Sequence, residues 1–267
     1  MKQDGELSRQ QIHNAAAFLD KKVPMYASVI GVLGILVIWE ILCRLQWIPP
    51  LYLPSPIDII RSGWEITVSG EVFEDVYTSL VRIIVGYVCG AALGISVGLI
   101  LGFFRWMDAI FTPVVYSIYP IPKIALLPLI ILWLGIGELP KIVIIALGVF
   151  FPVIINTYAG VRNIDPILIK VAITFGSSRL SIMRKVMLPA SLPTIMAGLK
   201  LAAGTSLILL VSAEMIASEK GLGAMILHYG HLMMTDRLLF GVFILSLLGL
   251  LFNRSLVWLE RKLLPWK

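Results

Sequence analysis

The sequence predicts an all-α integral membrane protein with six transmembrane helices. Of its 267 residues, 58% are hydrophobic and only 14% are charged, whereas water-soluble domains carry about 25% charged residues. A surface with so little charge must face lipid. The net charge of +6 is spread between long apolar runs, whereas a nucleic-acid-binding protein gathers its cations on one wet face. Nucleic acid is therefore not an expected partner.

Six apolar stretches approach or exceed the roughly 20 helical residues that cross a bilayer core of about 30 Å. They cover residues 26–43, 79–104, 109–134, 141–159, 193–217 and 238–259, to within a few residues. Pro120, Pro122 and Pro128 must break the third stretch, because proline removes a helical hydrogen bond. The resulting division is a cytoplasmic N-terminal segment (1–25), a first span with its outer loop (26–78), a transmembrane domain (79–259) and a cytoplasmic tail (260–267).

The basic residues predict the orientation. Six spans place both termini on one side of the membrane, and cytoplasmic loops carry the excess of Lys and Arg. With the termini inside, thirteen of the 22 basic residues are cytoplasmic and five are outside. The first 22 residues are polar, which predicts a cytoplasmic lead-in helix rather than a cleaved signal peptide. We therefore expect a multi-pass protein of the bacterial inner membrane, with both termini and the loop 161–192 in the cytoplasm.

Five glycines recur every four residues in the second stretch, at Gly86, Gly90, Gly94, Gly98 and Gly102. Small residues at this spacing let two helix backbones approach closely in lipid. Packing within one subunit is the favoured interpretation, and an interface between subunits is the alternative.

The predicted cytoplasmic loop contains a short amphipathic helix. Asp165 followed by Pro166 is typical of a helix start. Ile167, Val171 and Phe175 then recur every four residues and form one apolar stripe.

Gly176 is expected to end this helix. Ser177 or Ser178 can cap a second short helix that runs to about residue 187, where Leu188 and Pro189 would end it. The apolar face has no partner within so short a segment. It can lie on the bilayer surface or in the groove of a partner protein.

The spacing of this loop resembles the permease subunits of ABC importers. Their pattern is EAA, three residues, Gly, nine residues, Ile, any residue and Leu-Pro. Ala172, Gly176, Val186 and the pair Leu188-Pro189 match it in register. Lys170 and Val171 depart from it at the Glu and the first Ala.

Further stretches between about residues 53 and 262 resemble the branch that imports nitrate, taurine, aliphatic sulfonates and bicarbonate, with the sulfonate type nearest. They are LPSP at 53–56, PIPKIALLPL at 120–129, GIGELPK at 135–141, FFPVIINTYAG at 150–160, and SAEMI followed by GLG at 212–223.

The resemblance implies the type I importer fold, with a coupling helix between spans four and five. Two copies of the chain would form the pore as a homodimer, beneath an external solute-binding protein. ATP and Mg would bind to separate ATPase subunits, which agrees with the lack of a phosphate-binding G-x-x-x-x-G-K-[ST] motif here; the chain itself would hold no catalytic residue, metal or cofactor. The residues expected to couple to the ATPase are Asp165, Ile167, Leu168, Val171, Ala172, Phe175, Gly176, Ser177, Arg179, Leu188 and Pro189.

Ionisable side chains at membrane depth are candidates for the solute path. Glu214 either lines or gates that path or hydrogen-bonds to a neighbouring helix. Lys123, beside the broken backbone, either meets an anionic solute or reaches water at the interface. Arg82 lies near a span end, where reaching to water explains it. The expected path residues are Tyr116, Tyr119, Lys123, Trp133, Asn156 and Glu214.

Two other function classes compete with the importer permease. A secondary transporter or channel often has inverted repeats and intramembrane carboxylates, and neither a convincing repeat nor a second deep carboxylate is visible. An intramembrane enzyme would need a nucleophile with a base, or a metal cluster. His228 and His231 have no third ligand nearby, so the segment 221–236 is interpreted as a surface for the binding protein rather than as a metal site. Residues 47–74 are expected to form the other part of that surface.

Overall fold

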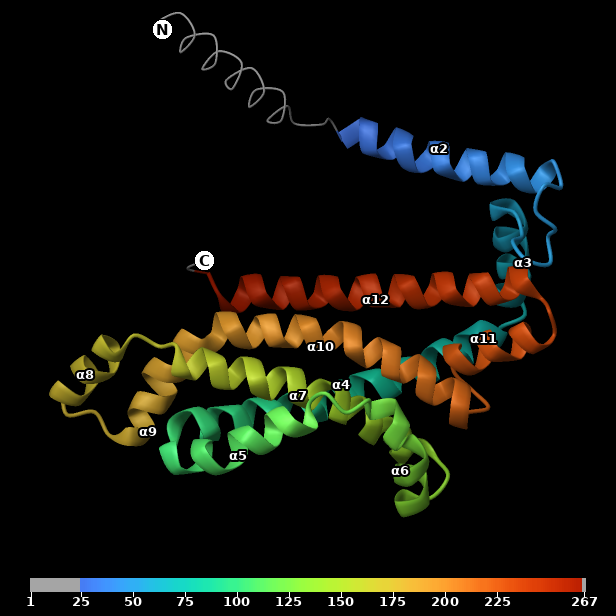
Figure 1. Cartoon of the computed structure of the whole chain (residues 1–267). Coiled ribbons are helices and arrows are strands. Elements are labelled where there is room, and N and C mark those ends of the chain that lie inside the picture. Colours follow the sequence, from blue (N-terminus) through green and yellow to red (C-terminus); the bar gives the residue numbers. More distant parts are fainter. Residues whose placement is uncertain (1–24, 266–267) are drawn as a thin grey trace, which may run out of the picture. The chain divides into compact units, whose positions relative to one another are not determined.

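The computed structural model describes residues 25–265, and every regular element in that part of the chain is a helix (Figure 1). The chain divides into two compact units, with the boundary between Asp58 and Ile59. The predicted N-terminal segment 1–25 lies outside the described residues, apart from Met25.

The first unit contains α2 (Met25–Arg44) and a turn that leads into α3 (Pro56–Val68). The predicted first span, 26–43, coincides with α2. The start of α3 explains the LPSP stretch: the Ser55 hydroxyl accepts from the Asp58 N–H at 3.2 Å and donates to the Asp58 carboxylate at 2.8 Å. Pro56 then occupies the first turn, where its missing N–H costs nothing.

The second unit holds the transmembrane core. Its elements after α3 are α4 (Glu71–Phe103), α5 (Arg105–Ile118), η1 (Lys123–Leu126), α6 (Leu127–Leu134), α7 (Glu138–Arg162), α8 (Pro166–Thr174), α9 (Arg179–Ile182), η2 (Met183–Met187), α10 (Leu188–Ala217), α11 (Leu222–His231) and α12 (Thr235–Leu263).

Four helical stretches among the described residues are long and apolar enough to cross a membrane: α4, α7, the run from α9 through α10, and α12. A fifth is counted if α5 and the pair η1–α6, which are bent by 90° at the break after Ile118, form one span. Pro120 and Pro122 lie in that break.

The structure differs from the sequence-based prediction at one helix boundary. Leu188 and Pro189 do not end a helix, because α9, the π-helical turn η2 and α10 continue from Arg179 to Ala217 without interruption. Pro189 lies in the first turn of α10, and the wider π turn before it accommodates the missing hydrogen bond.

The glycines of α4 pack against α7, which confirms packing within one subunit. A Cβ atom added at Gly94 would lie 2.9 Å from the Phe150 carbonyl oxygen, and one at Gly98 would lie 2.9 Å from that of Ile154. The backbones of the two helices are thus in direct contact along the stripe.

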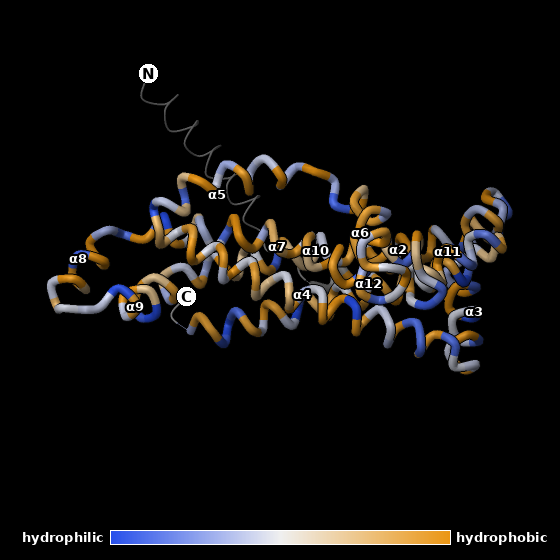
Figure 2. Tube along the Cα trace, turned by 90° about the horizontal axis from the view of Figure 1, so that it is seen from below, coloured by the Kyte–Doolittle hydropathy of each residue, from blue (hydrophilic) through white to orange (hydrophobic). Residues whose placement is uncertain are grey.

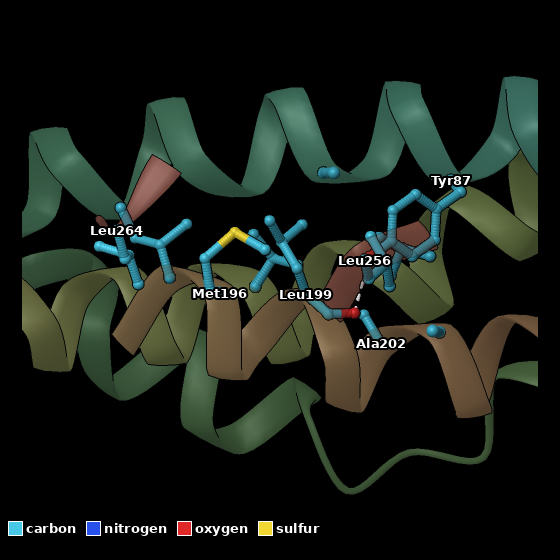
Figure 3. Packing of buried hydrophobic residues seen from close by; sticks show 11 residues of the cluster. Tyr87, Met196, Leu199, Ala202, Leu256 and Leu264 are labelled. Carbon is cyan, nitrogen blue, oxygen red and sulfur yellow. Dashed lines mark hydrogen bonds between the residues drawn. The ribbon is translucent and has the colours of Figure 1, made fainter. Parts of the chain in front are cut away.

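The core between α4, α7, α10 and α12 is shown in Figure 3. Tyr87 of α4 points toward α10 and donates its hydroxyl to the Leu199 carbonyl at 2.6 Å. Tyr87 also packs edge-to-face on Phe252 of α12, with ring centroids 4.8 Å apart. Leu256 and Met196 complete this layer.

Within the second unit, α8, α9 and the end of α12 lie at one extremity, and α11 lies at the other (Figure 1). In Figure 2 hydrophilic residues mark the segment that leads into α8 and the start of α9, while the loop between the two helices is nearly neutral in hydropathy. The structure therefore places the loop 163–187 at the same end of the second unit as the last turns of α12.

Candidate coupling loop and solute path

The short helix α8 has the caps that the sequence predicts. The Asp165 carboxylate accepts from the Ile167 N–H at 2.8 Å, and Pro166 takes the first helical position. Gly176 has φ +71, which places it in the left-handed region that favours glycine. Its N–H donates to Ile173 O at 2.9 Å, and that of Ser177 donates to Ala172 O at 3.1 Å.

We expect replacement of Asp165 by alanine to weaken α8 locally by about 1 kcal/mol, because an N–H loses its side-chain acceptor. Amide hydrogen exchange of residues 166–170 should become faster, while exchange in α7 stays unchanged. Asp165→Asn, which keeps an acceptor, is the control. Equal exchange in the alanine and asparagine variants would contradict the capping role.

The apolar stripe of α8 is exposed. The side chain of Phe175 is 84% exposed, and Ile167, Leu168 and Val171 are exposed as well. Ala172 differs from them: it is half-buried and packs with Ile169 on the cluster of Val161, Ile164, Ile182 and Met187. One face of α8 therefore holds the helix to its own subunit, and the other is available to a partner.

The rest of the loop leads into α10. The Ser178 hydroxyl, rather than that of Ser177, accepts from the Ser181 N–H at 3.3 Å and caps α9. Arg179 is exposed, whereas Leu188 and Pro189 are half-buried. A partner that contacts α8 and Arg179 thus lies directly at the start of the continuous helix to Ala217.

Glu214 lies at the opposite end of α10, fully buried at 0% exposure. The Ser79 hydroxyl lies 2.8 and 2.9 Å from its two oxygens, Arg82 Nη1 lies 2.8 Å from Oε1, and the Gly223 N–H donates to Oε2 at 2.8 Å. Of the two interpretations of Glu214, these contacts match the carboxylate that hydrogen-bonds to neighbouring helices.

Arg82 is the centre of this network. Its Nε and Nη2 atoms form a bidentate pair with Glu138 at 2.5 and 2.7 Å, and Nη1 also donates to Lys220 O at 2.7 Å. The Lys141 ammonium lies 3.1 Å from Oε1 of the same Glu138 carboxylate. Arg82 is only 2% exposed, so the interpretation that it reaches to water was wrong.

The turn between α10 and α11 closes over the network. Gly221 has φ +118, and a Cβ atom there would lie 2.5 Å from Glu214 Oε1. Its N–H donates to Asp75 at 2.7 Å, and the Leu222 N–H donates to Ser79 at 2.9 Å. Three stretches that stood apart in the sequence, GIGELPK, SAEMI and GLG, therefore meet around Arg82.

A hollow of about 420 Å³ lies beside the break between α5 and η1. The Lys123 ammonium donates to Ile118 O at 3.3 Å and to Tyr119 O, and lies 4.4 Å from the centroid of the Phe151 ring. The lining residues are Tyr119, Pro120, Ile121, Lys123, Gly148, Phe151, Pro152, Thr205, Ile208 and Leu209.

Of the expected path residues, only Tyr119 and Lys123 line this hollow. Tyr116 and Trp133 are exposed elsewhere, and the Asn156 amide donates to Pro152 O at 2.8 Å. Phe151, Thr205 and Ile208 were missed, since single apolar or hydroxyl residues in a span carry no sequence signal. Among residues 25–265, no group of His, Cys, Asp and Glu is arranged to hold a metal ion.

Residues 90–265 match the family described as "Binding-protein-dependent transport system inner membrane component". The chain belongs to this family. The permease is 36% identical over 233 residues to the aliphatic sulfonates transport permease protein SsuC of Bacillus subtilis, covering 87% of this chain and 84% of that protein. It is 34% identical over 243 residues to the taurine transport system permease protein TauC of Escherichia coli, covering 89% and 88%.

Among solved structures, the permease resembles a chain of the MetNI methionine ABC transporter in an inward-facing conformation. The TM-score is 0.60 at 22% identity, over 72% of this chain and 95% of that chain. This likeness identifies the fold as that of ABC importer permeases. The family match and the apolar helices described above together confirm a multi-pass inner membrane protein of a transport system.

Proposed function

We propose that the permease is the membrane-spanning subunit of an ATP-driven importer for small organic anions of the sulfonate class. Its relatives named for aliphatic sulfonates and taurine, each matched over more than four fifths of its length, support the substrate class. Nitrate and bicarbonate are carried in the wider branch that the sequence resembles, and no relative cited above is named for them.

The observation that carries the proposal is the loop 163–187. A capped helix presents Ile167, Val171 and Phe175 outward at the end of the unit where α12 also ends. An exposed apolar face of this kind suits a groove in a partner protein. We propose that this partner is the ATPase subunit and that α8 is the coupling helix.

The rest of the proposed assembly is what the resemblance to ABC importer permeases implies. Two copies of the permease form the pore, two ATPase subunits hold ATP and Mg on the cytoplasmic side, and an external binding protein delivers the solute. Both termini are cytoplasmic, with α2 as the first of six spans and α5, η1 and α6 as one broken span. The chain itself performs no catalysis and needs no cofactor of its own.

ATP-driven closure of the ATPases would displace α8 and α9, and α10 would carry the movement to the outer turn.

Replacing Gly176 by valine tests this role. The φ of +71 costs a β-branched side chain about 1–2 kcal/mol, while a Cβ atom there meets nothing within 4 Å of the same chain. We therefore expect the protein to insert and fold, but uptake per ATP hydrolysed to fall at least tenfold. The measurement is sulfonate uptake and binding-protein-stimulated ATP hydrolysis in proteoliposomes.

Gly70 supplies a matched control, because it has φ +89 and equally open surroundings but lies between α3 and α4. Gly70→Val should retain the ratio of uptake to ATP hydrolysis, because a weaker contact of the binding protein with the surface 47–74 would lower both rates together. Gly176→Asn, which tolerates the left-handed region, should retain most of that ratio. If the permease never co-purifies with its ATPase, and Gly176→Val leaves uptake intact, the proposal fails.

A further inference from the structure

The hollow beside the broken helix has an uneven chemical lining. Phe151, Pro152, Ile208 and Leu209 make it largely apolar, Lys123 contributes a cation, and no Asp or Glu is among its lining residues. At about 420 Å³ it falls within the range of small-ligand sites, which runs from about 300 to 1,000 Å³.

The Lys123 ammonium is held by groups without a formal charge. Ile118 O and Tyr119 O are at the end of α5, where Pro122 and the break prevent the next helical turn. Carbonyls at a helix end attract a cation, and so does the face of Phe151. Neither the carbonyl oxygens nor the ring carries a formal negative charge that would pair with the Lys123 ammonium at the edge of the hollow.

Gly148 and Thr205 add no hydrogen-bond donor to the lining that could hold an anionic head in place of Lys123. Pro152 has no N–H, so the Gly148 carbonyl lacks its helical partner. The Thr205 hydroxyl lies 3.4 Å from that carbonyl and 3.0 Å from Ala202 O. The single hydroxyl proton is shared between these two carbonyls, so Thr205 is not free to donate to an anion.

We infer that this hollow binds the solute in passage, with the anionic head on Lys123 and an apolar chain against Ile208 and Leu209. The inference rests on the proposed importer function and narrows its substrate class to alkanesulfonates without a second charge. Such a solute satisfies both halves of the lining: the head gains a charge-assisted contact, and the chain leaves water.

Two related solutes fit less well. Taurine carries an ammonium group, which would enter the hollow with no carboxylate to pair with, and an unpaired charge is costly away from water. Nitrate carries no chain and gains nothing from the apolar wall. The site should therefore discriminate among solutes that one importer branch handles.

Thiol protection in the assembled transporter tests the site. The permease–ATPase complex in nanodiscs would carry Ile208→Cys in a Cys43→Ala, Cys89→Ala background, since the side chain of Ile208 is exposed. A charged methanethiosulfonate reagent should label position 208, and pentanesulfonate should slow the labelling. Taurine and nitrate should require at least about tenfold higher concentrations for the same protection, as expected for the loss of one strong contact.

Lys123→Gln should weaken protection by pentanesulfonate about tenfold or more, and Lys123→Arg should retain it. Lys220→Gln, which removes the same charge from the Glu74 ion pair, should change nothing. Labelling only by lipid-soluble reagents, equal protection by taurine, or protection unaffected by Lys123→Gln would each overturn the inference. Binding-protein-stimulated ATP hydrolysis in the same preparation reports the proposed function separately: if it persists without protection, only the site is refuted.

Discussion

The Arg82→Met variant is expected to lose about 3–5 kcal/mol of stability, because it leaves Glu214 buried without its counter-charge. Glu214 has 0% exposure, and Glu138 would lose a bidentate partner at the same time. The network joins α4, α7, α10 and the turn before α11, so its loss should loosen the end of the unit that holds α11. Thermal unfolding of the purified protein in detergent, with hydrogen exchange of residues 214–223, measures the change.

A double variant separates lost charge pairing from lost packing. Arg82→Met with Glu214→Gln removes both buried charges, so it should recover part of the stability that the single variant loses. Arg61→Met is the matched control, because Arg61 and its partner Glu65 are both exposed and an exposed pair contributes little. A single variant as stable as the control, or a double variant less stable than the single one, would contradict the structural role.

Alanine at Gly90 is expected to cost about 1–3 kcal/mol or more, since overpacking forces backbone shifts. The added Cβ atom would overlap the Ala146 carbonyl oxygen and lie 2.9 Å from Val149 Cβ. A carbonyl within α7 cannot rotate away as a side chain would, so α4 and α7 must separate. The same detergent unfolding assay reports the loss.

Gly204→Ala is the control for this helix contact. Gly204 lies within α10, and a Cβ atom there meets nothing within 4 Å, so alanine should raise helix stability slightly. The opposite ranking of the two alanine variants would show that the glycine stripe of α4 does not set the distance between the helices.

Local chemistry could be predicted from the sequence, whereas the partners of long-range contacts could not. Asp165, Pro166 and Gly176 were interpretable because a cap depends on a few neighbouring residues, and the structure confirms them. Arg82 was misinterpreted because nothing near it in sequence indicates that Glu138 and Glu214, 56 and 132 residues away, approach it.

The boundary at Pro189 was misjudged for a related reason. Proline ends a helix only when no other turn absorbs the missing hydrogen bond, and the π turn Met183–Met187 provides that alternative. The close helix contact of α4 could be predicted because its glycines recur every four residues, and the carbonyl groups of α7 that they meet recur at the same interval. The residues around Lys123 were only half predicted: the prolines mark the break, but which parts of α7 and α10 face it depends on packing.

The contact between α4 and α7 restricts how the unit can change shape. Sliding motions between helices need side chains that can re-pack, and here glycines rest directly on carbonyl oxygens. A shift of one residue along the axis would bring a side chain against the opposing backbone. The two helices must therefore travel as one rigid body. Any movement that opens or closes a path must involve helices outside this pair, such as α5, α6 and α12, which are less deeply buried.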